Sequence, residues 1–140
     1  MSNYNAVAYS LISTESTITD ELANDPKGGK AIYPIRIPQG VKYPAVRFRK
    51  SIEPIHLKGG DAQRTFRVEF EIAVVSEDPD KCDEIQQLIY DRLDGRTHEN
   101  VAGHYVNNLV FQGQDPEIYS DDPDLFLITS RYTCTIHKNL

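Results

Sequence analysis

The chain has 140 residues, of which 39% are hydrophobic and 26% charged, a composition typical of one globular domain covering residues 1–140. Its net charge of −6 argues against a general nucleic-acid-binding protein, and no apolar run approaches the roughly 18 residues that cross a bilayer. Because the first residues lack the basic start and apolar core of a signal peptide, we expect a protein that stays in a cytoplasm without membrane contact.

The beginning of the chain has the pattern of an amphipathic helix. Apolar residues recur at helical spacing and share one face: Tyr4, Val7, Ala8, Leu11 and Ile12. The pattern fades in residues 13–19, where hydroxyl and β-branched side chains weaken a helix. Turn residues follow at 24–30 and 38–40, and they flank an extended stretch whose Pro34 suits a strand at a sheet edge.

Two strands are predicted in the middle of the chain, at residues 44–55 and 65–75, with a loop at 58–62 between them. Apolar and charged residues alternate in both strands, so one face of each strand is charged: Arg47, Arg49, Arg67, Glu69 and Glu71. If the strands pair antiparallel, the two arginines of the first could lie opposite the two glutamates of the second. Such cross-strand pairs contribute roughly 0.2–1 kcal/mol each.

A second helix is predicted after these strands. Asp78 can cap it, Pro79 suits its first turn, and Gly95 ends it after about Leu93. Its buried stripe contains Ile85, Leu88, Ile89 and Leu93.

The last third of the chain predicts strands at 105–111 and 125–137, separated by an acidic, proline-containing loop at 115–124. The order of elements is therefore helix, irregular strand, strand pair, helix and strand pair. This order is typical of the α+β class, and it predicts a mainly antiparallel sheet of four to five strands with two helices packed on one face.

The charges are segregated along the chain. Residues 27–67 hold ten Lys and Arg against two acids, a net of +8, whereas residues 77–126 hold thirteen acids against three bases, a net of −10. Two interpretations stay open. The two segments neutralise each other within one fold, or the basic face of one subunit meets the acidic face of its neighbour.

Candidate catalytic and metal-binding residues fail on spacing. His98 and His104 flank Glu99 but are six residues apart, whereas a zinc-protease helix needs its histidines four apart. The acidic loop lacks the central glycine and terminal glutamate of a calcium-binding EF-hand loop. The glycine pairs at 28–29 and 59–60 are too short for a phosphate-binding loop.

The two cysteines, Cys82 and Cys134, are interpreted as reduced, inert thiols rather than as a disulfide or a metal-binding pair. We therefore expect no enzymatic activity, no catalytic residue, no metal and no cofactor. The protein is expected to act through its surfaces, as a building block of an assembly.

Three short motifs occur in the turn-and-strand region: Ile32-Tyr33-Pro34, Pro38-Gln39-Gly40 and Pro44-Ala45-Val46, followed by Ser51. They resemble the "IYP … PQG … PAV … S" run of the tail-completion, or tail-terminator, family of long-tailed bacteriophages. The long strand, the helix and the final strand pair also fit the family pattern, at 66–75, 79–95 and 114–135. Ala31 stands where the family often has Arg.

The resemblance implies a structural protein of the virion tail, assembled in the cytoplasm of the host bacterium. Family members form a ring, typically a hexamer, on the head-proximal end of the tail tube. The ring stops polymerisation of the tail-tube protein and docks the head connector proteins, while DNA passes through without specific binding. Another head–tail joining protein, a connector or neck component, is the alternative; a small enzyme and a nucleic-acid-binding module are further ones.

A ring needs one surface of each subunit to contact a different surface of its neighbour. The candidate residues for this subunit interface are charged: Arg47, Arg49, Arg67, Glu69, Glu71, Asp121, Asp122 and Asp124.

Overall fold

The computed structural model describes residues 4–55, 65–121 and 124–137. Its helices are α1 (Tyr4–Ser13), α2 (Ser16–Thr19) and α3 (Pro79–Leu93). Its strands are β1 (Ile32–Pro34), β2 (Ala45–Pro54), β3 (Thr65–Ser76), β4 (Glu99–Val101), β5 (His104–Gln114), β6 (Ile118–Asp121) and β7 (Asp124–His137). None of these helices is both long enough and apolar enough to cross a membrane.

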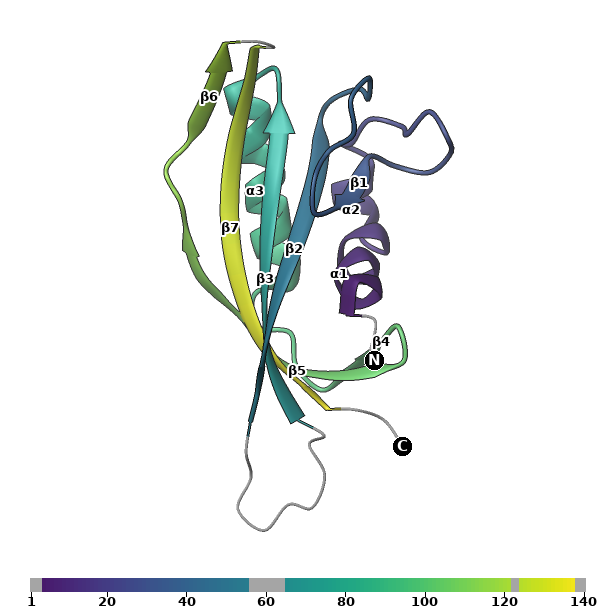
Figure 1. Cartoon of the computed structure of the whole chain (residues 1–140), viewed down its shortest axis with the longest axis vertical. Helices are drawn as coiled ribbons and strands as arrows, with labels where there is room; N and C mark the ends of the chain where they lie inside the picture. Colours follow the sequence, from purple (N-terminus) through teal and green to yellow (C-terminus); the bar gives the residue numbers. More distant parts are fainter. Residues whose placement is uncertain (1–3, 56–64, 122–123, 138–140) are drawn as a thin grey trace.

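The described strands form one seven-stranded sheet with the order β1-β2-β3-β7-β5-β4. β6 pairs with the first residues of β7, just beyond the point where β5 ends. All neighbouring strands are antiparallel except β1, which runs parallel to β2 at the sheet edge. At the upper end of the molecule in Figure 1, β6 lies on one flank of the sheet, and the loops between α2 and β2 lie on the opposite flank.

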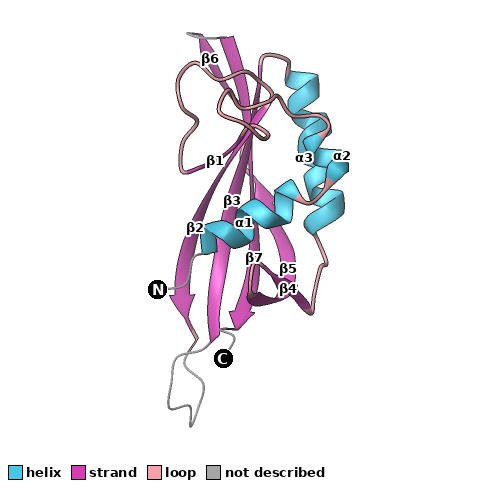
Figure 2. Ribbon diagram, turned by 90° about the vertical axis from the view of Figure 1, so that its right-hand side faces the viewer, coloured by secondary structure: helices cyan, strands magenta, loops and turns pink. Residues whose placement is uncertain are grey.

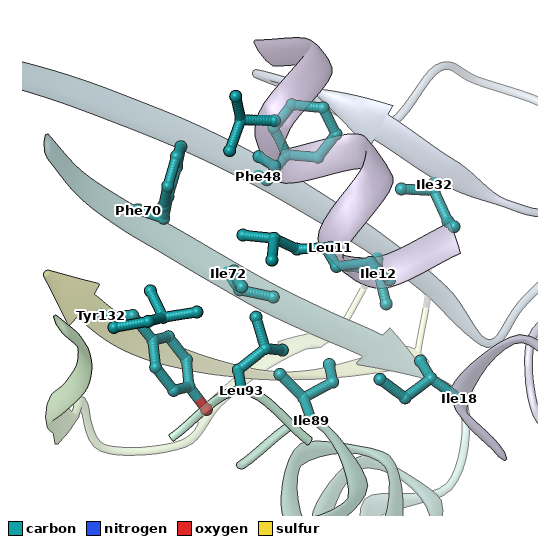
Figure 3. Packing of buried hydrophobic residues seen from close by; sticks show 14 of the residues in the cluster. Leu11, Ile12, Ile18, Ile32, Phe48, Phe70, Ile72, Ile89, Leu93 and Tyr132 are labelled. Carbon is teal, nitrogen blue, oxygen red and sulfur yellow. The ribbon is translucent and has the colours of Figure 1, made fainter. Parts of the chain in front are cut away.

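One face of the sheet packs against the helices, and Figure 2 shows α1 and α3 on the same side of the strands. Every second residue of β3 and β7 points toward this face, so Phe70, Ile72 and Tyr132 are at most 2% exposed. Figure 3 shows the helices and the other strands filling the same core, through Leu11, Ile12, Ile18, Ile32, Phe48, Ile89 and Leu93. Each large side chain buried in this way stabilises the fold by roughly 1.5–3 kcal/mol.

The apolar stripe of α1 and both ends of α3 agree with the sequence prediction. All five residues predicted for the apolar stripe of α1 are buried. Asp78 caps α3 by accepting a hydrogen bond from the backbone N–H of Asp80 at 3.0 Å, and Pro79 occupies the first turn. Gly95 follows α3 with a φ of +85°, in the left-handed region that glycine adopts without strain.

The α+β class is confirmed, but the sheet is larger than the four to five strands expected. The additional β4 and β6 are only three and four residues long, too short for alternation to reveal them. β6 also corrects the prediction of a continuous acidic loop at 115–124, because it pairs with β7 inside that range.

A third helix is a further correction. Residues 13–19 were expected to weaken helix formation, yet α2 forms within them. Ile18 is fully buried in the core, and this burial outweighs the weak helix propensity of its Ser and Thr neighbours. The predicted loop at 58–62 lies outside the described residues.

Candidate interaction surfaces

The second face of the sheet is polar along the described parts of β2, β3 and β7 from Arg49, Glu71 and Arg131 onward, and the helices do not cover it. Toward β1 the same face is apolar and buried, at Ala45, Ala73 and Val75. Residues of β2, β3 and β7 that alternate with the core positions point to this uncovered face. The register aligns them in rows: Arg49–Glu71–Arg131, Ser51–Glu69–Thr133 and Glu53–Arg67–Thr135. The face therefore presents ordered rows of charges and hydroxyl groups.

Glu71 is the centre of a cluster on the uncovered face. Its Oε1 accepts a short hydrogen bond from Arg49 and lies 3.4 Å from Nη1 of Arg47. Burial raises the pKa of Glu71, but the two arginines outweigh burial, so the pKa lies below its ordinary value of 4.5. The carboxylate is ionised at neutral pH, and two arginines around one glutamate leave the cluster with net positive charge.

The predicted cross-strand pairing is confirmed for one of the two glutamates. Arg49 lies directly opposite Glu71, and Arg47 reaches the same carboxylate from the neighbouring row. For Glu69 the prediction is wrong: it lies opposite Ser51, and no ion pair joins it to another described residue.

Two shallow hollows mark the uncovered face. One measures about 310 Å³ and includes Arg49, Ser51 and Glu69. The other measures about 200 Å³ and lies between Arg67 of β3 and Val110 of β5. Since small-molecule sites are usually larger and mostly apolar, these hollows suit side chains of another protein better than an enclosed ligand.

A separate, open pocket of about 530 Å³ lies between the two loops that precede β2; we call it the loop pocket. Its lining residues are Asp25, Pro26, Lys27, Tyr33, Pro38, Gln39, Gly40 and Val41. The hydroxyl of Tyr33 donates to Oδ1 of Asp25 at 2.9 Å, and burial together with this carboxylate raises the pKa of Tyr33 to about 12. The phenol therefore stays protonated and ties the first loop to β1.

The opposite flank of the sheet presents exposed apolar side chains on β6. Ile118 is 58% exposed and Tyr119 is 52% exposed. The hydroxyl of Tyr119 donates to Asp124 at 2.6 Å, and its ring centre lies 5.0 Å from that of Phe126. Tyr119 is therefore held in one orientation although half of its surface faces solvent.

Carboxylates surround this end of the molecule. Burial raises the pKa of Cys82 in α3 to about 11; a backbone hydrogen bond opposes this rise, and the nearby carboxylates of Asp83, Glu117 and Asp78 add to it. The thiol of Cys82 donates to the backbone carbonyl of Phe126, which lies opposite Tyr119 in the pairing of β6 with β7, so the first turns of α3 lie beside this end of the sheet. We call this surface the β6 flank, defined by Asp78, Asp83, Glu117, Ile118 and Tyr119.

The ion pairs show whether the basic and acidic segments of the chain pair with each other within the fold. Among the ion pairs between described residues, none joins a residue of the basic segment 27–67 to one of the acidic segment 77–126. The ion pairs thus give no support to neutralisation within the fold. Charges of both segments remain available for contact with another molecule.

The candidate interface residues fall on two surfaces rather than one. Five share the uncovered face: Arg47, Arg49, Arg67, Glu69 and Glu71. Asp124 begins β7 and pairs with the backbone of Asp121 at the end of β6, near the β6 flank. Asp122 lies outside the described residues.

The residues considered as catalytic or metal-binding candidates have structural roles in the fold. The carboxylate of Glu99 faces Arg96, at 2.6 and 2.7 Å, and His98 contacts the hydroxyl of Tyr105 at 2.8 Å. Cys82 and Cys134 are unbridged and buried as predicted, and burial raises the pKa of Cys134 to about 12. Across the described ranges, no group of three or more His, Cys, Asp or Glu side chains is placed to hold a metal ion.

Three features escaped the sequence reasoning: β6, the loop pocket and the backbone of Ile35. The adjacent β-formers Ile118 and Tyr119 could have indicated β6. Ile35 has a φ of +68°, which is rare for a β-branched residue, and no signal in its neighbours predicts this conformation.

No protein-family model matches the chain, and no curated protein matches its sequence. Solved structures do match its fold. A chain in the virion of a native gene transfer agent particle has a TM-score of 0.72 and 14% sequence identity, over 94% of this chain and 92% of that one. A second solved structure has a TM-score of 0.50 and 15% identity, over 97% of this chain and 94% of that one. At these identities the likeness shows a shared fold over nearly the whole domain.

Proposed function

We propose that this chain is a structural subunit of a phage-type virion, and that it forms the ring that terminates the tail tube. The likeness to a chain of a gene transfer agent virion, over 94% of the domain, carries the proposal. The motifs at 32–46 support the finer assignment, because they resemble the tail-terminator family.

The surfaces of the molecule suit this role. A ring subunit must offer different surfaces to the neighbours on its two sides and a further surface to the proteins above and below it. The loop pocket, the β6 flank and the uncovered face are three such surfaces on one rigid domain. The ring would stop addition of tail-tube protein, dock the head connector and let DNA pass, and none of these tasks needs catalysis.

The proposed ring is testable with purified protein. We expect native mass spectrometry to find a closed oligomer, a hexamer by the family resemblance, and negative-stain microscopy to show rings, alone or on the ends of tail tubes. A protein that stays monomeric at all concentrations and does not bind tail tubes would contradict the proposal.

A connector or neck protein is the second candidate, because the virion likeness supports either position in the particle. The partner distinguishes the two. Pull-down with tail tubes supports the terminator, whereas binding to portal assemblies and not to tubes supports the connector.

A further inference from the structure

We infer that the loop pocket and the β6 flank are the two halves of one contact, in which the β6 flank of one subunit docks into the loop pocket of a second copy. The inference rests on the proposed ring and names the contact that closes it. It is drawn from three observations: the positions of the two surfaces, their charges and their exposed apolar side chains.

The two surfaces lie on opposite flanks of the same end of the molecule. Figure 1 shows β6 on one side of the sheet and the loops before β2 on the other, and the view turned by 90° in Figure 2 places the loops in front of β6. A subunit therefore cannot join its own two surfaces. A contact between them must be head-to-tail, which is the kind of contact that generates a ring.

The loop pocket has a largely apolar lining with one base, Lys27, and one acid, Asp25, whose carboxylate accepts from Tyr33. Pro26, Pro38 and Val41 contribute apolar surface to the lining. The same two loops carry four basic residues: Lys27, Lys30, Arg36 and Lys42. No ion pair joins any of these four to another residue of the described part of the chain. The pocket thus favours an occupant that is apolar at its centre and acidic around it.

The β6 flank has this composition. Ile118 and Tyr119 are its exposed apolar residues, one on each face of β6, and Glu117 beside them and Asp78 and Asp83 at the start of α3 are also exposed. β6 is a short strand that pairs with β7 at the sheet edge, where a strand can be reached by another chain. Aromatic and aliphatic anchors that enter a pocket, with charges at the rim, are the usual composition of a protein interface.

Both halves are ordered before they meet, which lowers the entropy lost on binding. Asp124 fixes the hydroxyl of Tyr119, and Asp25 fixes that of Tyr33. Ile35, which directly follows β1, is 63% exposed, and its N–H donates to the carbonyl of Phe48 at 2.8 Å.

Charge reversal on each half tests the contact. Lys27→Glu, Lys30→Glu, Arg36→Glu and Lys42→Glu together make the two loops acidic, and Asp83→Lys with Glu117→Lys leaves the β6 flank with net positive charge. Each variant alone should be monomeric, because every contact would join like charges. Mixed in equal amounts, the two variants should assemble again, because each contact then joins opposite charges. Native mass spectrometry should find the two variants in equal numbers within each assembly.

A third variant tests the apolar centre. Ile118→Ser removes an exposed anchor without changing charge, and we expect it to weaken self-association about tenfold or more. Sedimentation velocity measures the change in dissociation constant, and circular dichroism checks that each variant keeps the wild-type fold.

The matched control is Gln87→Lys with Asp91→Lys, on exposed positions of α3 about 6 and 12 Å further along the helix than Asp83. It should assemble like the wild type. If the reversed variants still form rings, or if their mixture stays monomeric, this inference is overturned while the ring stands. A wild-type protein that forms no ring overturns the proposed function and this inference together.

Discussion

Arg96 shows how a single side chain joins three parts of the domain. Its guanidinium binds both carboxylate oxygens of Glu99 in β4 and lies 3.3 Å from Oε1 of Glu15, in the turn between α1 and α2. The hydrogen bond from Arg96 outweighs burial and lowers the pKa of Glu99 below its ordinary 4.5. Only the planar fork of an arginine can bind a carboxylate through two parallel hydrogen bonds.

We expect Arg96→Lys to lower the free energy of unfolding by about 0.5–1 kcal/mol at pH 7, a modest loss because the pair is partly exposed to solvent. Because the folded pKa of Glu99 is depressed, the stabilisation is fully present above pH 4.5 and is lost as the pH falls through the folded pKa. Urea unfolding at neutral and acidic pH should therefore show a difference between wild type and variant that shrinks below pH 4.5.

Arg92→Lys is the control for this prediction. Arg92 lies 4.0 Å from the same Glu15 but is 47% exposed, so its replacement should change stability by less than about 0.5 kcal/mol. Equal losses in the two variants, or a loss independent of pH, would contradict the role given to the Arg96–Glu99 pair.

Elements whose signals lie within one stretch of sequence were predictable. The cap and end of α3 and the alternation of β2 and β3 follow from local patterns, whereas the register of the two strands was predicted for Glu71 and not for Glu69. The edge strand β1 was also predicted, from the extended stretch around Pro34. The short strands β4 and β6 were not, because they are too short for alternation and depend on their partner strands. The loop pocket lies within residues 25–41, but turn residues alone do not show how two loops fold toward each other, so the pocket escaped prediction.

The uncovered face of β2 and β3 is a second candidate surface for the contact between subunits. If this face contributes to the subunit interface, Arg47→Gln with Arg49→Gln should raise the dissociation constant of the ring several-fold, because the net positive cluster around Glu71 is lost. Sedimentation velocity measures the effect. Arg92→Gln on α3 removes a positive charge elsewhere and should have little effect. Unchanged association in the double variant would exclude this face from the subunit interface and leave the ring intact.

For the whole molecule, the segregated charges make one side of the domain basic and the opposite side acidic. The basic loops and the acidic β6 flank lie on opposite sides of one end, an arrangement that in the proposed ring would attract copies of the chain head to tail. Such an arrangement steers association and selects its orientation more than it adds affinity, whereas the apolar residues at the centre of each surface supply most of the binding free energy.

Salt should therefore separate the two contributions. Raising the ionic strength from about 0.1 M to 1 M shortens the Debye length from about 10 Å to 3 Å and screens charges at an exposed rim. We expect slower association and a higher dissociation constant at high salt, measured by stopped-flow light scattering and sedimentation, with the fold unchanged by circular dichroism. The Ile118→Ser variant, which has lost part of the apolar centre, should dissociate at lower salt than the wild type. A ring whose association rate does not change with salt would show that the segregated charges play no part in assembly.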